Sequence, residues 1–122
     1  MITIKEVIRC ADQFCEEAQV KITDGEFELT CFSHLCKFQE GQQVDVIIGA
    51  LSAEHIVKSA NTEYRIEKLS GIFDYSLTGK LIDKVRSIIA IGHISIEIDG
   101  YIPNDIDVGE FIDFQCARLD LT

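Results

Sequence analysis

The feature that most constrains this fold is a hydrophobic pattern that occurs twice, each time counted from two glycines. Apolar residues stand two, four and six positions after Gly25, and again after Gly92. They also stand three, five, seven and ten positions after Gly41, and again after Gly109. Successive side chains of a β-strand point to opposite faces, so this alternation predicts strands with one buried face. The repeated positions are Phe27, Leu29, Cys31, Val44, Val46, Ile48 and Leu51 in one unit, and Ile94, Ile96, Ile98, Ile112, Phe114, Cys116 and Leu119 in the other.

The duplication predicts one domain over residues 1–122 with an internal pseudo-repeat, whose units span about 7–51 and 79–119. No stretch rich in proline, glycine or serine separates the units as a linker would. Because 47% of the residues are hydrophobic, the chain has enough apolar side chains to form a core. We therefore expect two related sets of strands that share one β interior.

The N-terminal segment, residues 4–18, fits two kinds of secondary structure. Thr3 and Glu6 would form a capping box at the start of a helix. One face of that helix would carry Ile4, Val7, Ile8, Ala11, Cys15 and Ala18. As a strand, the segment aligns Val7-Ile8 with Leu81-Ile82 ahead of the second unit. We favour the strand, because a duplication carries the same element in both units.

Between the repeated positions the chain reads as short strands and turns, with one short helix. Strands are expected over 18–22, 64–68, 75–85, 88–91 and 110–119, the third with a bulge or bend at Gly79. Asp24-Gly25 is typical of a two-residue type I′ hairpin turn, because both residue types tolerate positive φ. Ser52 and Asn61 are suited to cap a helix over 53–60.

Roughly eight short strands and one small helix predict an all-β protein, in which closure into a barrel removes free strand edges. The segment Gly109-Glu110-Phe111-Ile112-Asp113-Phe114, ahead of Arg118-Leu119, resembles the last strand of OB-fold-like small barrels. In the first unit, the segment Glu40-Gly41-Gln42-Gln43-Val44-Asp45-Val46 resembles that strand of OB-fold-like barrels as well. The resemblance covers both units and implies a small OB-like barrel, closed or partly open. It implies no ligand.

Charge and composition limit the partners and the location. The formal net charge is −10, and an acidic surface repels the phosphates of nucleic acid. No apolar run is long enough to span a bilayer, and the first residues lack the features of a signal peptide. Five cysteines, an odd number, are typical of a compartment that keeps thiols reduced. We therefore expect a cytoplasmic protein that does not associate with membranes.

The cysteine spacing raises zinc as a ligand. Cys10 and Cys15 form one pair and Cys31 and Cys36 a second, with four residues between the members of each pair. Structural zinc sites are usually built from tighter pairs with two intervening residues. We expect ordinary thiols, and the sequence leaves open whether these four residues bind zinc.

The remaining motifs for catalysis or cofactor binding are incomplete. Residues 74–81 contain Gly79-Lys80 but lack the first glycine and the hydroxyl of a phosphate loop. Residues 105–116 carry a cysteine where a calcium loop has its bidentate glutamate. The three histidines belong to no recognisable catalytic motif. We expect neither enzymatic activity nor a cofactor.

The function that we expect is a non-enzymatic protein-binding module, of the inhibitor or immunity type, with a basic protein partner. Beyond Ser95 the chain has seven acids and one base, Arg118, and two of its aromatic residues interrupt the acidic stretch. The expected partner-binding residues are Glu97, Asp99, Tyr101, Asp105, Asp107, Glu110, Phe111 and Asp113.

Two alternatives remain open at this stage. One is a module for single-stranded nucleic acid, in which aromatic rings stack on bases and basic side chains bind phosphates. Its rings would be Tyr64, Phe73 and Tyr75, and its basic residues Lys80, Lys84 and Arg86. The other is a structural or accessory domain that forms a homodimer through a free strand edge.

Overall fold

The computed structural model describes residues 2–10 and 16–121. These residues form twelve strands in one sheet and no helix, which confirms the predicted all-β fold class. The strands of the first unit are β1 (Ile2–Arg9), β2 (Ala18–Thr23), β3 (Glu28–Ser33), β4 (Gln43–Val44) and β5 (Ile47–Leu51). The others are β6 (Glu54–Lys58), β7 (Arg65–Lys68), β8 (Tyr75–Asp83), β9 (Ile88–Ile91), β10 (Ile94–Ile98), β11 (Phe111–Cys116) and β12 (Arg118–Asp120). The N-terminal segment is a strand where it is described, and residues 11–15 lie outside the described residues.

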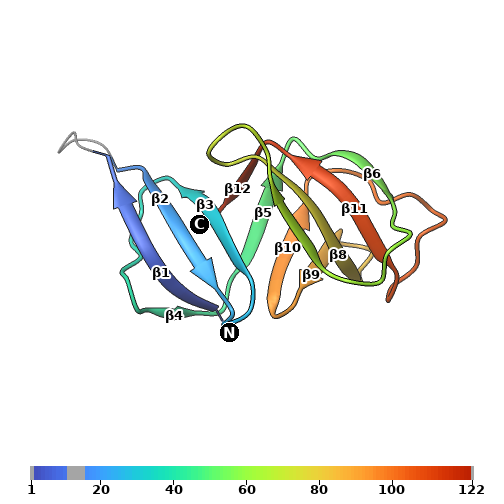
Figure 1. Ribbon diagram of the computed structural model, residues 1–122, viewed down its shortest axis with the longest axis horizontal. Coiled ribbons are helices and arrows are strands. Elements are labelled where there is room, and N and C mark those ends of the chain that lie inside the picture. The colour runs from blue at the N-terminus through green and yellow to red at the C-terminus, as the bar shows by residue number, and fades with distance from the viewer. Residues whose placement is uncertain (1, 11–15, 122) are drawn as a thin grey trace.

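Both end strands of the sheet are next to the central strand β5 in the chain. The strand order of the sheet is β4-β1-β2-β3-β12-β5-β10-β9-β8-β11-β6, with β7 beside β8. The end strands β4 and β6 are each joined to β5 by two residues, 45–46 and 52–53. Each half of the sheet therefore curls back toward β5, which lies between the two halves (Figure 1). Hydrogen bonds between the described strands do not close the sheet, and this agrees with a partly open barrel.

The two units pair their strands in the same way. β4 runs antiparallel to β1, and β11 runs antiparallel to β8. The continuation of each of these strands then crosses to the other unit: β5 runs parallel to β10, and β12 runs parallel to β3. At the centre β5 and β12 pair with each other antiparallel. Each unit thus supplies a strand to the other.

A matching turn leads into the last strand of each unit. The Gly41 N–H donates to the Ile4 carbonyl at 2.7 Å, and the Gly109 N–H donates to the Leu81 carbonyl at 2.8 Å. The two glycines have φ values of +85° and +96°, which glycine adopts without strain. Ile4 therefore occupies the position in the first unit that Leu81 occupies in the second. The sequence analysis aligned Val7 with Leu81, so that alignment is wrong by three residues.

One hydrophobic core extends through both units. Ile94, Ile96 and Ile98 are at most 3% exposed. With the exception of Leu51, every repeated apolar position belongs to this core or packs against it. The alternation in the sequence therefore identified the buried faces of the strands.

The segment expected to be a helix, residues 53–60, contains the strand β6 instead. β6 pairs antiparallel with β11. Ser52 caps no helix, because its N–H donates to the Asp99 carboxylate at 2.8 Å and its φ is +55°. The apolar spacing of this segment suits a helix, but β-branched Ile56 and Val57 also suit a strand, and pairing with β11 decides between them.

The connection between β2 and β3 is longer than predicted. Thr23 pairs with Glu28, so residues 24–27 join the two strands. The Asp24 carboxylate accepts hydrogen bonds from the N–H groups of Glu26 and Phe27 at 2.9 and 2.7 Å. The Asp24 side chain therefore caps backbone N–H groups of a four-residue connection. The predicted two-residue turn at Asp24-Gly25 is wrong.

Two strands are interrupted at places other than those predicted. β8 continues through Gly79, and its register shifts further along, between Leu81 and Asp83. Gly79 serves close packing: an added Cβ would lie 2.4 Å from Ile89 Cδ1. The last strand is broken at Ala117, where the chain passes from β11 to β12 and so from its own unit to the other.

Candidate functional site

The loop 99–110, between β10 and β11, is held against the fold by apolar anchors and backbone bonds. Ile102 and Ile106 are 9% and 0% exposed. The Ile106 N–H donates to the Pro103 carbonyl at 3.1 Å, and the Asp99 N–H donates to the Ala50 carbonyl at 3.2 Å. Tyr101, next to the first anchor, is 96% exposed. The anchors therefore fix the course of the loop and leave the Tyr101 side chain outside.

Three of the expected partner-binding acids gather around two lysines. Lys58 forms an ion pair with Glu110, and Lys84 Nζ lies 3.7 Å from Asp107 Oδ1. The hydrogen bond from Lys58 lowers the pKa of Glu110. The same bond, aided by the charges of Asp105 and Asp107, raises the pKa of Lys58. The structure thus brings these three acids together and neutralises part of their charge.

Two other expected acids are bonded to neighbouring groups of the protein. The Asp99 carboxylate accepts the N–H groups of Ser52 and Ala53 at 2.8 and 2.9 Å, and so fixes the corner between β5 and β6. Glu97 Oε2 lies 3.4 Å from Arg86 Nη2, across the β9–β10 hairpin. Asp99 is therefore committed to the backbone, and Glu97 is paired.

The last two expected residues lie on β11 and also make internal contacts. The Thr78 hydroxyl donates to the Asp113 carboxylate across the β8–β11 pair. The Phe111 ring packs against Tyr64 with their centroids 5.5 Å apart. The eight expected residues therefore do not form one surface: Tyr101, Asp105 and Asp107 are exposed on the loop, whereas Phe111 and Asp113 are partly buried on β11.

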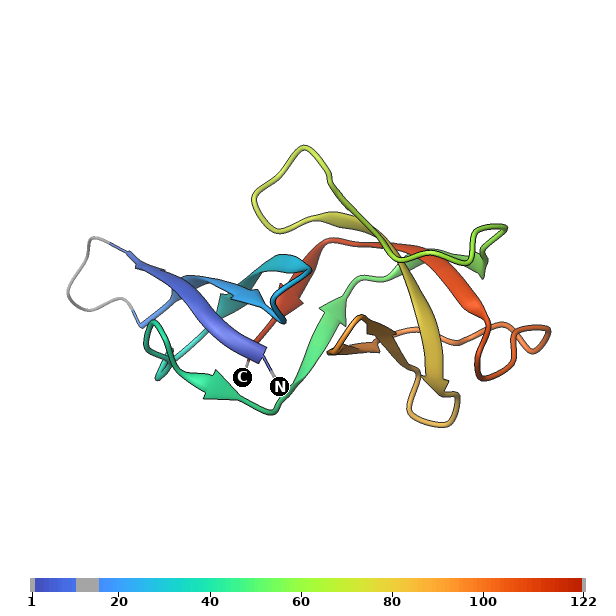
Figure 2. The ribbon, with the colours of Figure 1, turned by 60° about the horizontal axis from the view of Figure 1, so that its bottom comes forward.

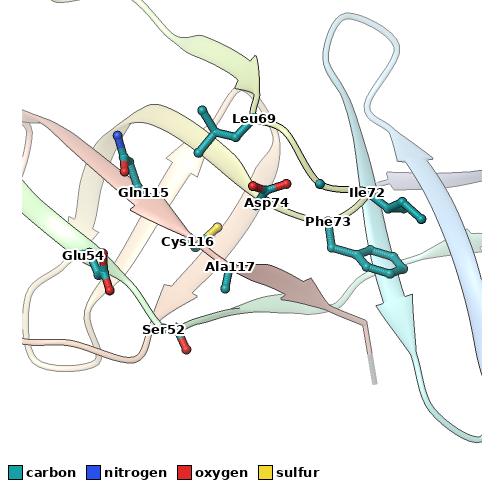
Figure 3. Close-up of a pocket in the computed structure, with 10 residues that line it drawn as sticks. Ser52, Glu54, Leu69, Ile72, Phe73, Asp74, Gln115, Cys116 and Ala117 are labelled. Carbon is teal, nitrogen blue, oxygen red and sulfur yellow. The ribbon is translucent and has the colours of Figure 1, made fainter.

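A cleft of about 420 Å³ lies beneath the loop between β7 and β8. Figure 2 shows this loop projecting from the sheet, and Figure 3 shows the cleft between it and the chain around the β11–β12 break. The residues that line it are Ser52, Glu54, Leu69, Gly71, Ile72, Phe73, Asp74, Gln115, Cys116 and Ala117. No local pattern in the sequence predicted this cleft, because its walls come from three separate segments.

The cleft combines acidic groups with apolar walls. Glu54 and Asp74 are its charged residues, and no lysine, arginine or histidine lines it. Asp74 Oδ1 is buried and accepts no hydrogen bond. Burial raises the pKa of the Cys116 thiol to about 11, which keeps it protonated and unreactive. The cleft is therefore suited to bind a cation rather than to perform thiol chemistry.

The described residues do not assemble the cysteines into a metal site. Cys31, Cys36 and Cys116 carry free thiols, Cys10 is disulfide-bonded, and Cys15 lies outside the described residues. Burial raises the pKa of Cys31. Within residues 2–10 and 16–121, no three His, Cys, Asp or Glu side chains lie close enough to share a metal ion.

The rings assigned to base stacking contact other parts of the fold. Tyr75 is 4% exposed, so it presents no face to a base. Tyr64 packs edge-on against Phe27, and Phe73 packs edge-on against Phe32, with centroids 5.5 and 5.8 Å apart. Tyr75 is therefore excluded as a stacking ring, whereas Tyr64 and Phe73 are only partly buried, and the nucleic-acid alternative stays a prediction.

The strand β6 gives the self-association alternative a location. β6 ends the sheet and pairs only with β11 among the described strands. Val57 on this strand is 52% exposed. An end strand offers its outer backbone groups to another chain. Self-association through β6 stays a prediction.

None of the described residues forms a helix that is long and apolar enough to cross a membrane. No curated protein and no solved structure gives a significant match to the chain. A family model does match, and it covers residues 1–122. The chain belongs to the family described as uncharacterised conserved protein UCP019853.

Proposed function

We propose that this protein is a non-enzymatic binding module that takes a basic protein partner on the loop 99–110. The observation that carries the proposal is the exposure of Tyr101 beside the buried anchors Ile102 and Ile106. Exposed aromatic residues supply much of the binding energy at protein interfaces. A loop that is already fixed loses little conformational entropy when a partner binds.

The charge of the protein supports a basic partner. Asp105 is exposed, and the Asp107 side chain is 82% exposed, on a chain with a formal net charge of −10. Exposed charges at the rim of an interface mainly change the rate at which partners meet. Lys58 and Lys84 offset part of the local negative charge. Because Asp105 and Asp107 are exposed, we expect them to contribute mainly to the association rate with the partner.

We also propose a cytoplasmic location. The free thiols of Cys31, Cys36 and Cys116 support it, since reducing compartments keep thiols unpaired. Cys10, which is disulfide-bonded, is the exception among the described cysteines.

Paired baits test the proposed function. Immobilised wild-type protein and an Asp105→Lys, Asp107→Lys variant are exposed to the same native lysate, and captured proteins are quantified by mass spectrometry. The control bait carries Glu26→Lys and Asp45→Lys, which change the charge equally at exposed positions of the first unit. We expect a basic protein that wild type and control capture and the loop variant loses. If no captured protein distinguishes the loop variant from the control, the proposal fails.

A further inference from the structure

The cleft beneath the β7–β8 loop is built on the hairpin that β7 forms with β8. Gly79 of β8 lies opposite Ile112, as Ile2 of β1 lies opposite Val44. β7 pairs with residues 75–78, the part of β8 that precedes Gly79. The loop of this hairpin, residues 69–74, supplies one wall of the cleft. Loops on a rigid scaffold are common locations for binding sites.

Asp74 gives this cleft an unmet electrostatic requirement. Its Oδ1 is buried and accepts no hydrogen bond from the described residues, and Gly71 lies beside it: a Cβ on Gly71 would be 2.5 Å from that oxygen. Lys68, on the same hairpin, donates instead to the carbonyls of Gly71 and Ile72, and it lies over the Tyr75 ring. A carboxylate oxygen that is buried without a donor is costly, and a nearby cation lowers that cost.

The remaining walls fit the stem of a long cationic side chain. Leu69, Ile72 and Phe73 supply apolar surface along the loop side of the cleft, as Figure 3 shows. Ile72 is 57% exposed and lies at the rim. Arginine and lysine carry several methylene groups that pack on apolar surface and a charged end that is attracted to carboxylates and aromatic faces.

We infer that the cleft binds an arginine or lysine side chain of the basic partner. Its charged end lies beside Asp74, and its methylene groups pack against the loop. This inference rests on the proposed function, because it assigns the basic residue of that same partner to a second contact point.

The test uses a peptide and its neutral isostere. The ¹⁵N-labelled protein is titrated with acetyl-Gly-Arg-Gly-amide and, separately, with the same peptide carrying citrulline in place of arginine. We expect the arginine peptide to shift the amide signals of Ser52, Asp74 and Ala117 with a dissociation constant on the order of 1 mM, typical of a single side chain. Loss of the charge-assisted contact should weaken binding about tenfold for citrulline.

Variants separate this inference from the proposed function. Asp74→Asn should weaken the arginine peptide about tenfold, while Asp45→Asn, at an exposed position of the first unit, should not. Asp105→Lys with Asp107→Lys should leave the peptide response unchanged, because the loop 99–110 does not line the cleft. Equal binding of both peptides, or an unchanged response in Asp74→Asn, would overturn the inference even if the loop variant loses the protein partner.

Discussion

Gly79 and Gly49 both lie within strands of the sheet, yet their surroundings differ. A Cβ on Gly79 would lie 2.4 Å from Ile89 Cδ1 and 2.9 Å from the Ala90 carbonyl oxygen, whereas a Cβ on Gly49 would meet nothing within 4 Å. Neither glycine has a positive φ, so the comparison isolates packing from backbone strain.

Gly79→Ala is therefore expected to destabilise the fold. Overpacking of this kind costs about 1–3 kcal/mol in the free energy of unfolding. Gly49→Ala should change that free energy by less than about 0.5 kcal/mol. Urea denaturation of both variants measures the difference, and equal losses would contradict the packing described for β8 and β9.

Asp24 joins the two units through its carboxylate. Oδ2 accepts the His93 N–H at 2.8 Å, and Oδ1 accepts two N–H groups of its own loop. Burial acts to raise the pKa of Asp24, but the backbone hydrogen bonds, led by the one from His93, outweigh it and lower the pKa. The ionised form is thus favoured in the folded protein.

Stability should depend on this ionisation at acid pH. Because the folded pKa lies below the unfolded value of about 3.9, the contribution is present above the unfolded pKa and is lost as the pH falls through the folded pKa. Asp24→Asn should lower the free energy of unfolding by about 1 kcal/mol at neutral pH and leave a shallower acid dependence. Urea denaturation between about pH 7 and pH 2.5 measures both. Asp45→Asn is the matched control, and an Asp24→Asn profile parallel to wild type would exclude this role.

At the scale of elements, alternation in the sequence predicted most strands because each buries one face. The core strands β3, β5, β10 and β11 follow from apolar residues at every second position. The prediction of a short helix over 53–60 was wrong because β-branched Ile56 and Val57 also suit a strand, and the partner strand β11 comes from far along the chain. Local spacing holds no information about that pairing.

The duplicated turns offer a test of the two-unit arrangement. Gly41 and Gly109 have positive φ and empty space where a Cβ would lie, so substitution by alanine strains only the backbone. We expect each substitution to cost about 1–2 kcal/mol, and the two costs to be similar. Thermal or urea denaturation of the two variants measures this, and a loss of stability in only one variant would show that the two turns are not equivalent.

At the scale of the whole molecule, the sheet exchanges strands between its units and returns both ends to β5. The sequence predicted the two sets of strands but not their exchange, since apolar alternation identifies a buried face and not the neighbour across it. The candidate site was predictable only in part. The acidic stretch could be recognised in the sequence. However, Asp99 accepts hydrogen bonds from Ser52 and Ala53, and Asp113 accepts one from Thr78. These contacts depend on pairing between segments that are distant in the chain.

The cleft follows from the same long-range geometry. Its lining residues lie in three segments, 52–54, 69–74 and 115–117, that meet where β11 gives way to β12. None of these segments has a motif of its own. Its acidic character depends on Glu54 and Asp74, which are twenty residues apart in the chain and lie outside the acidic stretch.

The most direct test of a charge-steered binding loop is the association rate with the partner that the paired baits identify. Stopped-flow measurements at about 20 and about 200 mM salt compare wild type with the Asp105→Lys, Asp107→Lys variant. Wild type should associate about tenfold faster at the lower salt concentration, and the variant should be slower there and much less sensitive to salt. Equal rates and equal salt dependence for the two proteins would contradict the account.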